Sequence, residues 1–123
     1  MAKVKQLTIP LENRPGALAE VARVLADAKV NVVALLGSTS GTQGSAQVVV
    51  DNVNRAKKAL DNAGKSYSEG TLEQFELNNK PGALADLAEK FARKGINLDS
   101  GYGTVAKGAK KAVLIVATSQ PTA

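Results

Sequence analysis

The sequence reads Asn13-Arg14-Pro15-Gly16-Ala17-Leu18-Ala19 at a strand-to-helix turn and returns, 66 residues later, to Asn79-Lys80-Pro81-Gly82-Ala83-Leu84-Ala85. Aligned without a gap, residues 13–31 and 79–97 are identical at nine of nineteen positions. Unrelated sequences of this composition would share about one position. The chain is therefore built from a duplicated unit.

The repeat divides the 123 residues into two small units, which we place at residues 1–69 and 70–123. Apolar periodicity and turn residues outward from the first turn predict six elements in the first unit. These are a strand at 4–11, a helix at about 16–28, strands at 31–37 and 46–50, a helix at 53–63 that Asn52 caps, and a short strand near 66–69.

That order of elements is typical of the ferredoxin-like α+β arrangement, a four-stranded antiparallel sheet in the spatial order four, one, three, two, with both helices on one face. Helical spacing predicts that the first helix buries Leu18, Val21, Ala22 and Leu25. The glycines, serines and threonines of residues 37–45 predict a flexible loop, and residues 101–111 a second one.

The second unit repeats only part of this pattern. Strands are predicted at residues 70–77, 97–104 and 111–118, with a helix at 82–94 that buries Leu84 in place of Leu18. The chain then ends before a last helix and strand. We therefore expect bare apolar sheet surface and an open strand edge there, and a homodimer formed through this truncated second unit.

Composition excludes several classes of function. The chain has no cysteine and no histidine, which removes thiolate metal sites and the commonest general base. No cofactor and no enzymatic activity are expected, and without a secretory or membrane-spanning apolar run we expect a cytoplasmic protein that does not bind membranes. A net charge of +5 is mild, and two phenylalanines and two tyrosines offer little for base stacking, which argues against nucleic acid.

The repeated turn suits a binding site for a small zwitterion. Pro15 fits the first helical position, and Gly16 lets a ligand approach the amide groups of the helix start, which attract a carboxylate. Asn13 and Asn79 carry both a donor and an acceptor to this place, as could Asn31 and Asn97 at the start of the next strand. The alternative is that Asn13 and Asn79 only cap their helices.

Over residues 4–118 the chain resembles two tandem ACT domains, and its segments Leu11 to Leu18 and Val30-Asn31-Val32 are similar to the serine-binding ACT domain of phosphoglycerate dehydrogenase. The resemblance implies an amino-acid effector held between two modules. Since Leu11 replaces a histidine of that relative, serine specificity does not carry over. The resemblance implies ligand roles for Asn13 and Asn31, and more weakly for Asn79 and Asn97. Together with the residues of the turns, the ligand-binding residues that we predict are Leu11, Asn13, Arg14, Pro15, Gly16, Ala17, Asn31, Asn79, Gly82 and Asn97.

The function that we expect is therefore that of a regulatory protein that senses a free amino acid. Two alternatives stay open at this point. The chain could be a protein interaction module without a metabolite, or an RNA-binding protein of the same fold class.

Overall fold

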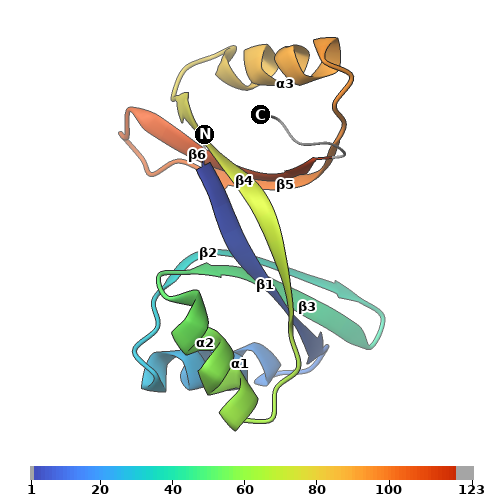
Figure 1. Cartoon of the computed structure of the whole chain (residues 1–123), viewed down its shortest axis with the longest axis vertical. Helices are drawn as coiled ribbons and strands as arrows, with labels where there is room; N and C mark the ends of the chain where they lie inside the picture. Colours follow the sequence, from blue (N-terminus) through green and yellow to red (C-terminus); the bar gives the residue numbers. More distant parts are fainter. Residues whose placement is uncertain (1, 119–123) are drawn as a thin grey trace. The chain divides into compact units, whose positions relative to one another are not determined.

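The computed structural model describes residues 2–118, which pack into two units. The first unit is Lys5–Gly70, and the second combines residues 2–4 with the described residues from 71 onward. Two long strands, β1 (Ala2–Glu12) and β4 (Ser68–Asn78), therefore contribute residues to both units (Figure 1).

The first unit has the predicted ferredoxin-like order. After β1 come α1 (Ala17–Asp27), β2 (Val32–Ser40), β3 (Gln43–Val50), α2 (Val53–Asn62) and the start of β4. Its strands lie in the order β2-β3-β1-β4, and β3 pairs antiparallel with both β1 and β2. Both helices cover one face of this sheet (Figure 1). The predicted spatial order of four, one, three, two is confirmed.

The core of the first unit forms where the two helices meet that face. Leu7 and Ile9 of β1 pack with Val21 and Leu25 of α1 and with Leu60 of α2, and all five are almost completely buried. The N-terminus of α2 is fixed as the sequence predicts, because the side chain of Asn52 accepts a hydrogen bond of 3.0 Å from the backbone N–H of Arg55. Packing and capping together place α2 beside α1.

The buried stripe of α1 differs from the predicted one. The helix begins at Ala17, and Ala17, Val21 and Leu25 are buried, whereas Leu18 is 44% exposed. Residues four apart share a helix face, so the buried face runs through Ala17, Val21 and Leu25. Leu18 and Ala22 each lie one residue further along the helix, outside that face, and are exposed. The prediction that Leu18 and Ala22 are buried is wrong, and Leu84 of the second unit, 59% exposed, repeats the result.

The long loop predicted at residues 37–45 is also wrong. Strands β2 and β3 continue through it, and only Gly41 and Thr42 separate them. Thr39 pairs with Gly44, where a Cβ atom would come within 2.9 Å of the Ser38 carbonyl oxygen. Glycine at position 44 therefore serves a close approach inside the ladder and does not mark a loop. The second predicted loop, at residues 101–111, is also shorter than expected, because its first four residues belong to a strand.

The second unit contains β4, α3 (Ala83–Arg93), β5 (Leu98–Thr104) and β6 (Lys111–Thr118). Strands β4 and β5 both pair antiparallel with β6. The core includes Phe75, Phe91, Ile96 and Val116, and the two phenylalanine rings meet edge to face with their centroids 5.3 Å apart. Within residues 2–118 the second unit contains one helix, α3, and the prediction that no helix follows β6 concerns residues 119–123, which lie outside the described residues.

The strand edge that was expected to be bare is occupied. The predicted strands near residues 66–69 and at 70–77 are one continuous strand, β4, and residues 2–4 of β1 take the fourth-strand place in the second unit. There Lys3 Nζ lies 3.3 Å from Glu73 Oε1, whose side chain is only 8% exposed. Since β1 and β4 each have 11 residues, about twice the common strand length, each can serve two units.

Candidate functional site

The start of α1 presents amide groups without protein partners. Gly16 caps the helix in the left-handed conformation, at φ 87°, and no side chain caps it. Within residues 2–118 the N–H groups of Leu18 and Ala19 donate no hydrogen bond, whereas that of Glu20 donates to the Gly16 carbonyl oxygen at 3.0 Å. Two amide hydrogens at the positive end of the helix dipole are therefore available to an anion. The helix begins after Gly16, so the prediction that Pro15 occupies the first helical position is wrong.

Asn13 connects the turn to the β2–β3 hairpin. Its side-chain Nδ2 donates to the Gly41 carbonyl oxygen at 2.8 Å, and its backbone N–H donates to the Thr42 carbonyl oxygen at 2.9 Å. Asn13 therefore does not cap α1, and the capping alternative is wrong. Its Oδ1 accepts no hydrogen bond from any residue that the structure describes, so this acceptor is available at the turn.

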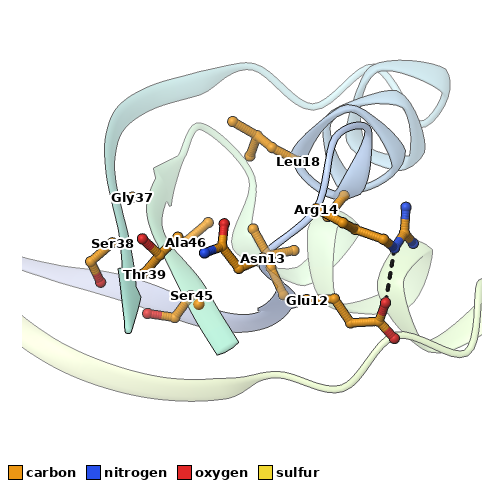
Figure 2. A pocket seen from close by; sticks show the side chains of 12 residues that line it. Glu12, Asn13, Arg14, Leu18, Gly37, Ser38, Thr39, Ser45 and Ala46 are labelled. Atoms are coloured by element: carbon orange, nitrogen blue, oxygen red, sulfur yellow. Dashed lines mark hydrogen bonds and ion pairs between the residues drawn. The ribbon is translucent and has the colours of Figure 1, made fainter. Parts of the chain in front are cut away.

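A pocket of about 390 Å³ opens beside this turn. Figure 2 shows Leu18 projecting from α1 on one side, with Asn13 directed toward Thr39 and Ala46 of the strands. The lining is mixed: apolar side chains lie beside the charged and amide groups of the turn, and the hairpin contributes hydroxyl groups. The volume lies in the range of small-molecule sites. The residues that line it are Leu11, Glu12, Asn13, Arg14, Ala17, Leu18, Gly37, Ser38, Thr39, Gly44, Ser45 and Ala46.

Arg14 is held by two carboxylates. Its Nε lies 2.9 Å from Glu12 Oε2, and its Nη2 lies 3.0 Å from Glu20 Oε2. The hydrogen bonds to Glu12 and Glu20 raise the pKa of Arg14, and the hydrogen bond from Arg14 lowers the pKa of Glu20. In Figure 2 the Arg14 side chain extends toward Glu12, away from the hairpin strands. Its charge is therefore compensated within the turn itself.

The structure does not bring Asn31 to the same place as Asn13 within the first unit. Asn31 precedes β2, where its N–H donates to Asp51 Oδ1 at 3.0 Å, whereas Asn13 is bonded to the hairpin beyond the other end of β2. The nine residues of β2 separate these ends by about 26 Å. Of the predicted residues, Leu11, Asn13, Arg14 and Ala17 share the pocket, while Pro15 and Gly16 shape its turn.

The second turn repeats the backbone geometry of the first. Gly82 caps α3 at φ 89°, again without a side-chain cap. The side-chain Nδ2 of Asn79 donates to the Ala109 carbonyl oxygen at 2.9 Å, and the backbone N–H of Asn79 donates to the Lys110 carbonyl oxygen at 2.9 Å. Asn97 lies just before β5, where its Nδ2 donates to Asp99 Oδ1 at 2.7 Å. As in the first unit, the two asparagines lie at opposite ends of a strand.

The side chains around the second turn differ from those of the first. A pocket of about 360 Å³ lies there, and Asn78 takes the place of Glu12. The lining carries three lysines and two carboxylates, and Lys111 Nζ donates to Asn78 Oδ1 at 2.7 Å. The lining residues are Glu76, Leu77, Asn78, Lys80, Ala83, Asp86, Leu87, Lys90 and Lys111. The two turns therefore offer the same amide groups beside different charges.

Sequence reasoning missed the hairpin side of the first pocket. Ser38, Thr39 and Ser45 line it, but their segment was interpreted as a loop. A signal was present, since small polar residues flank Gly41 and Thr42 on both sides, as in a tight hairpin. In the part of the chain that the structure describes, acidic side chains form no cluster of three that could hold a metal ion, and no helix has the length and apolarity to cross a membrane.

Comparisons with known proteins agree with this fold. The family model described as an ACT domain pair matches residues 2–122. The ACT domain-containing protein ACR3 of Arabidopsis thaliana is 35% identical over 94 residues, which are 76% of this chain but only 20% of that protein. The chain thus spans about a fifth of the length of this curated relative.

Two solved structures are similar over most of the chain. The crystal structure of protein BT0572 from Bacteroides thetaiotaomicron has a TM-score of 0.91 at 28% sequence identity. The superposition covers 96% of this chain and 81% of the BT0572 chain. The ligand-free regulatory subunit of aspartate kinase from Thermus thermophilus has a TM-score of 0.69 at 16% identity, covering 94% and 87%, which shows a common fold. With the family match over nearly every residue, the chain belongs to the ACT domain pair family.

Proposed function

We propose that this chain is a regulatory, non-catalytic protein that senses a free amino acid at the strand-to-helix turns of its ACT units. The observation that carries the proposal is the start of α1, where the N–H groups of Leu18 and Ala19 have no partner among the described residues and lie next to a pocket. An amino acid brings the carboxylate that such a helix start attracts.

The chemistry of the first pocket supports a zwitterion with a small or apolar side chain. The carboxylate would accept hydrogen bonds from the two amide groups, and the ammonium group would donate to Asn13 Oδ1. Leu11 and Leu18 offer apolar contact for the ligand side chain. Arg14 is already paired with Glu12 and Glu20, so an acidic ligand side chain would find no uncompensated positive charge there.

Asn31 can contribute only from a different ACT unit, because β2 separates it from the turn of its own unit. The resemblance to the serine-binding ACT domain, in which the effector lies between two modules, supports such an arrangement. Regulation would then follow if the amino acid binds one state of the assembly more tightly than another, since only differential affinity shifts an equilibrium.

A thermal-shift screen against the twenty amino acids tests the proposal. At a concentration of 100 times Kd the ligand should stabilise the chain by about 2.7 kcal/mol. Asn13→Ala should abolish the shift if the first turn is the site, and Asn79→Ala is the matched variant of the second turn, with an equivalent backbone hydrogen bond. A chain that none of the twenty amino acids stabilises would instead favour the protein interaction module.

Self-association belongs to the same proposal. The homodimer through the truncated second unit stays a prediction. One of its two grounds is removed, because residues 2–4 of β1 occupy the strand edge, while the absence of a second helix within the described residues remains. Light scattering across a dilution series measures the state directly, and a monomer at every concentration would contradict it.

A further inference from the structure

Given the proposed function, on which this assignment rests, we propose that the second turn selects an amino acid with a second carboxylate in its side chain, aspartate or glutamate. The second turn would then differ in its ligand from the first. The observation that carries the proposal is a group of three lysines, Lys80, Lys90 and Lys111, that line the pocket of the second turn. None of them forms an ion pair with a residue between 2 and 118.

The repeat shows why the charge of Lys80 is left uncompensated. Lys80 takes the place that Arg14 has in the first turn, where two carboxylates hold the cation. In the second turn the position of Glu12 is occupied by Asn78, which has no charge. The other acidic position keeps a carboxylate, yet Asp86 and Lys80, both within the described range, form no ion pair. An anionic ligand therefore meets a cation here whose counterpart in the first turn already has partners.

The other two lysines of this pocket have neutral counterparts in the first unit. Lys90 stands at the position of Val24, and its side chain leans toward the start of α3, because helical side chains tilt toward the N-terminus. Lys111 lies opposite Asn78 in the ladder of β4 and β6, where the first unit has Gln43 on β3. The hydrogen bond from Lys111 to Asn78 leaves the positive charge intact, because an amide is neutral. The second pocket therefore has two cations that the first lacks.

The balance of charge differs accordingly between the two pockets. Glu76 and Asp86 are the carboxylates of the second lining, so its three lysines exceed them by one. The first lining has one cation, Arg14, and one carboxylate, Glu12, which are paired with each other. Each helix start adds about half a positive charge to its own pocket. The second pocket thus offers two centres of positive charge, the helix start and the lysines, whereas the first offers only the helix start.

An acidic amino acid matches these groups. Within the described chain the N–H groups of Leu84 and Ala85 donate no hydrogen bond, so they are available to the α-carboxylate. The ammonium group would donate to Asn79 Oδ1, which accepts no hydrogen bond from the described residues. The second carboxylate would then lie among the lysines, where each exposed ion pair adds a factor of about two to five in affinity. A neutral side chain would leave the lysines without this contact.

Nuclear magnetic resonance of the backbone amides tests the choice of ligand with two matched pairs, glutamate with glutamine and aspartate with asparagine, because the members of each pair differ mainly in charge. For at least one pair, the acid should move the resonances of Leu84 and Ala85 with a Kd at least about fivefold lower than that of its amide. Equal affinities, or no movement with either acid, would overturn the proposal. Inorganic phosphate should bind there more weakly than the acid, since it brings no ammonium group to Asn79. Equally tight binding of phosphate would also overturn it.

Substitutions separate the pocket from the general charge of the chain. Lys80→Gln should weaken binding of the acid about two- to fivefold and leave that of its amide unchanged. Lys94→Gln is the control, because it removes the same charge from the C-cap of α3, outside the lining. Asn78→Glu, which restores the carboxylate of the first turn, should also weaken binding of the acid. Equal effects of Lys80→Gln and Lys94→Gln, or an unchanged Kd in Lys80→Gln or Asn78→Glu, would contradict the role of the lysines.

The amide resonances of the two turns distinguish this proposal from the proposed function. If an amino acid moves the resonances of Leu18 and Ala19 while neither acid moves those of Leu84 and Ala85, the acidic ligand is wrong and the proposed function stands. If no amino acid moves the resonances of either turn, both are wrong.

Discussion

Replacing Gly16 with alanine should destabilise the fold by a backbone effect alone. Gly16 has φ 87° and ψ −13°, in the left-handed region, where a Cβ atom costs about 1–2 kcal/mol. An added Cβ would meet only Arg14 Nη1, at 3.9 Å, which is ordinary contact, so no clash adds to this cost. We therefore expect Gly16→Ala to lower the free energy of unfolding by about 1–2 kcal/mol.

The repeat supplies a second measurement of the same quantity. Gly82 has φ 89° and nothing within 4 Å of an added Cβ, so Gly82→Ala should cost the same amount. Since the two added methyl groups share no neighbour, the double variant should lose about 2–4 kcal/mol. Gly37→Ala is the matched control, because Gly37 has no positive φ and its Cβ would also enter open space.

Urea denaturation followed by circular dichroism measures all four variants. The midpoints of Gly16→Ala and Gly82→Ala should fall with an unchanged slope, while that of Gly37→Ala stays within about 0.5 kcal/mol of the parent protein. If Gly16→Ala were no more destabilising than Gly37→Ala, the left-handed cap would not be a requirement of the turn. The turn would then give no structural reason for the bare amide groups of Leu18 and Ala19.

Three further predictions concern packing, charge and the shared strands. Leu60→Ala should cost about 2–5 kcal/mol in a urea titration, since Leu60 is fully buried between α2 and the sheet, and a smaller loss would mean that the site collapses around the cavity. Arg14 lowers the pKa of Glu20, so the stability that this pair adds is present above the ordinary carboxyl pKa and is lost as pH falls through the folded-state pKa. The difference between the parent and Glu20→Gln should accordingly be present at neutral pH and vanish in acid, and a constant difference would argue against the pairing. Deleting residues 1–4 should raise hydrogen exchange in residues 71–118 far more than in α1 and α2, because it removes the fourth strand of the second unit only; uniform exchange would contradict this division.

Apolar periodicity and the turn residues were enough to predict the class of fold, the strand order of the first unit and the cap of α2. These follow from local chemistry, such as the Asn52 side chain at a helix start and the alternation that buries Leu7 and Ile9. The two copies of the duplicated segment also have equivalent surroundings, which is why the side-chain hydrogen bonds of Asn13 and Asn79 match. Local signals of this kind can be interpreted without knowing the rest of the chain.

The errors lie where a distant segment decides the outcome. Nothing near the N-terminus indicates that residues 2–4 serve a different unit from Lys5 onward, because the alternation of β1 is uninterrupted. Gly44 is typical of a loop until the ladder with Thr39 shows why glycine is required there. Leu18 fits either side of the helical stripe, and only the position of the cap at Gly16 leaves it exposed at the pocket.

Nuclear magnetic resonance of the backbone amides tests the central claim most directly. On titration with an amino acid of uncharged side chain that stabilises the chain, the amide proton resonances of Leu18 and Ala19 should move more than any others, since these two groups would gain a charged acceptor. If every one of the twenty amino acids left both resonances in place, or if the largest changes lay away from both turns, the proposed site would be contradicted.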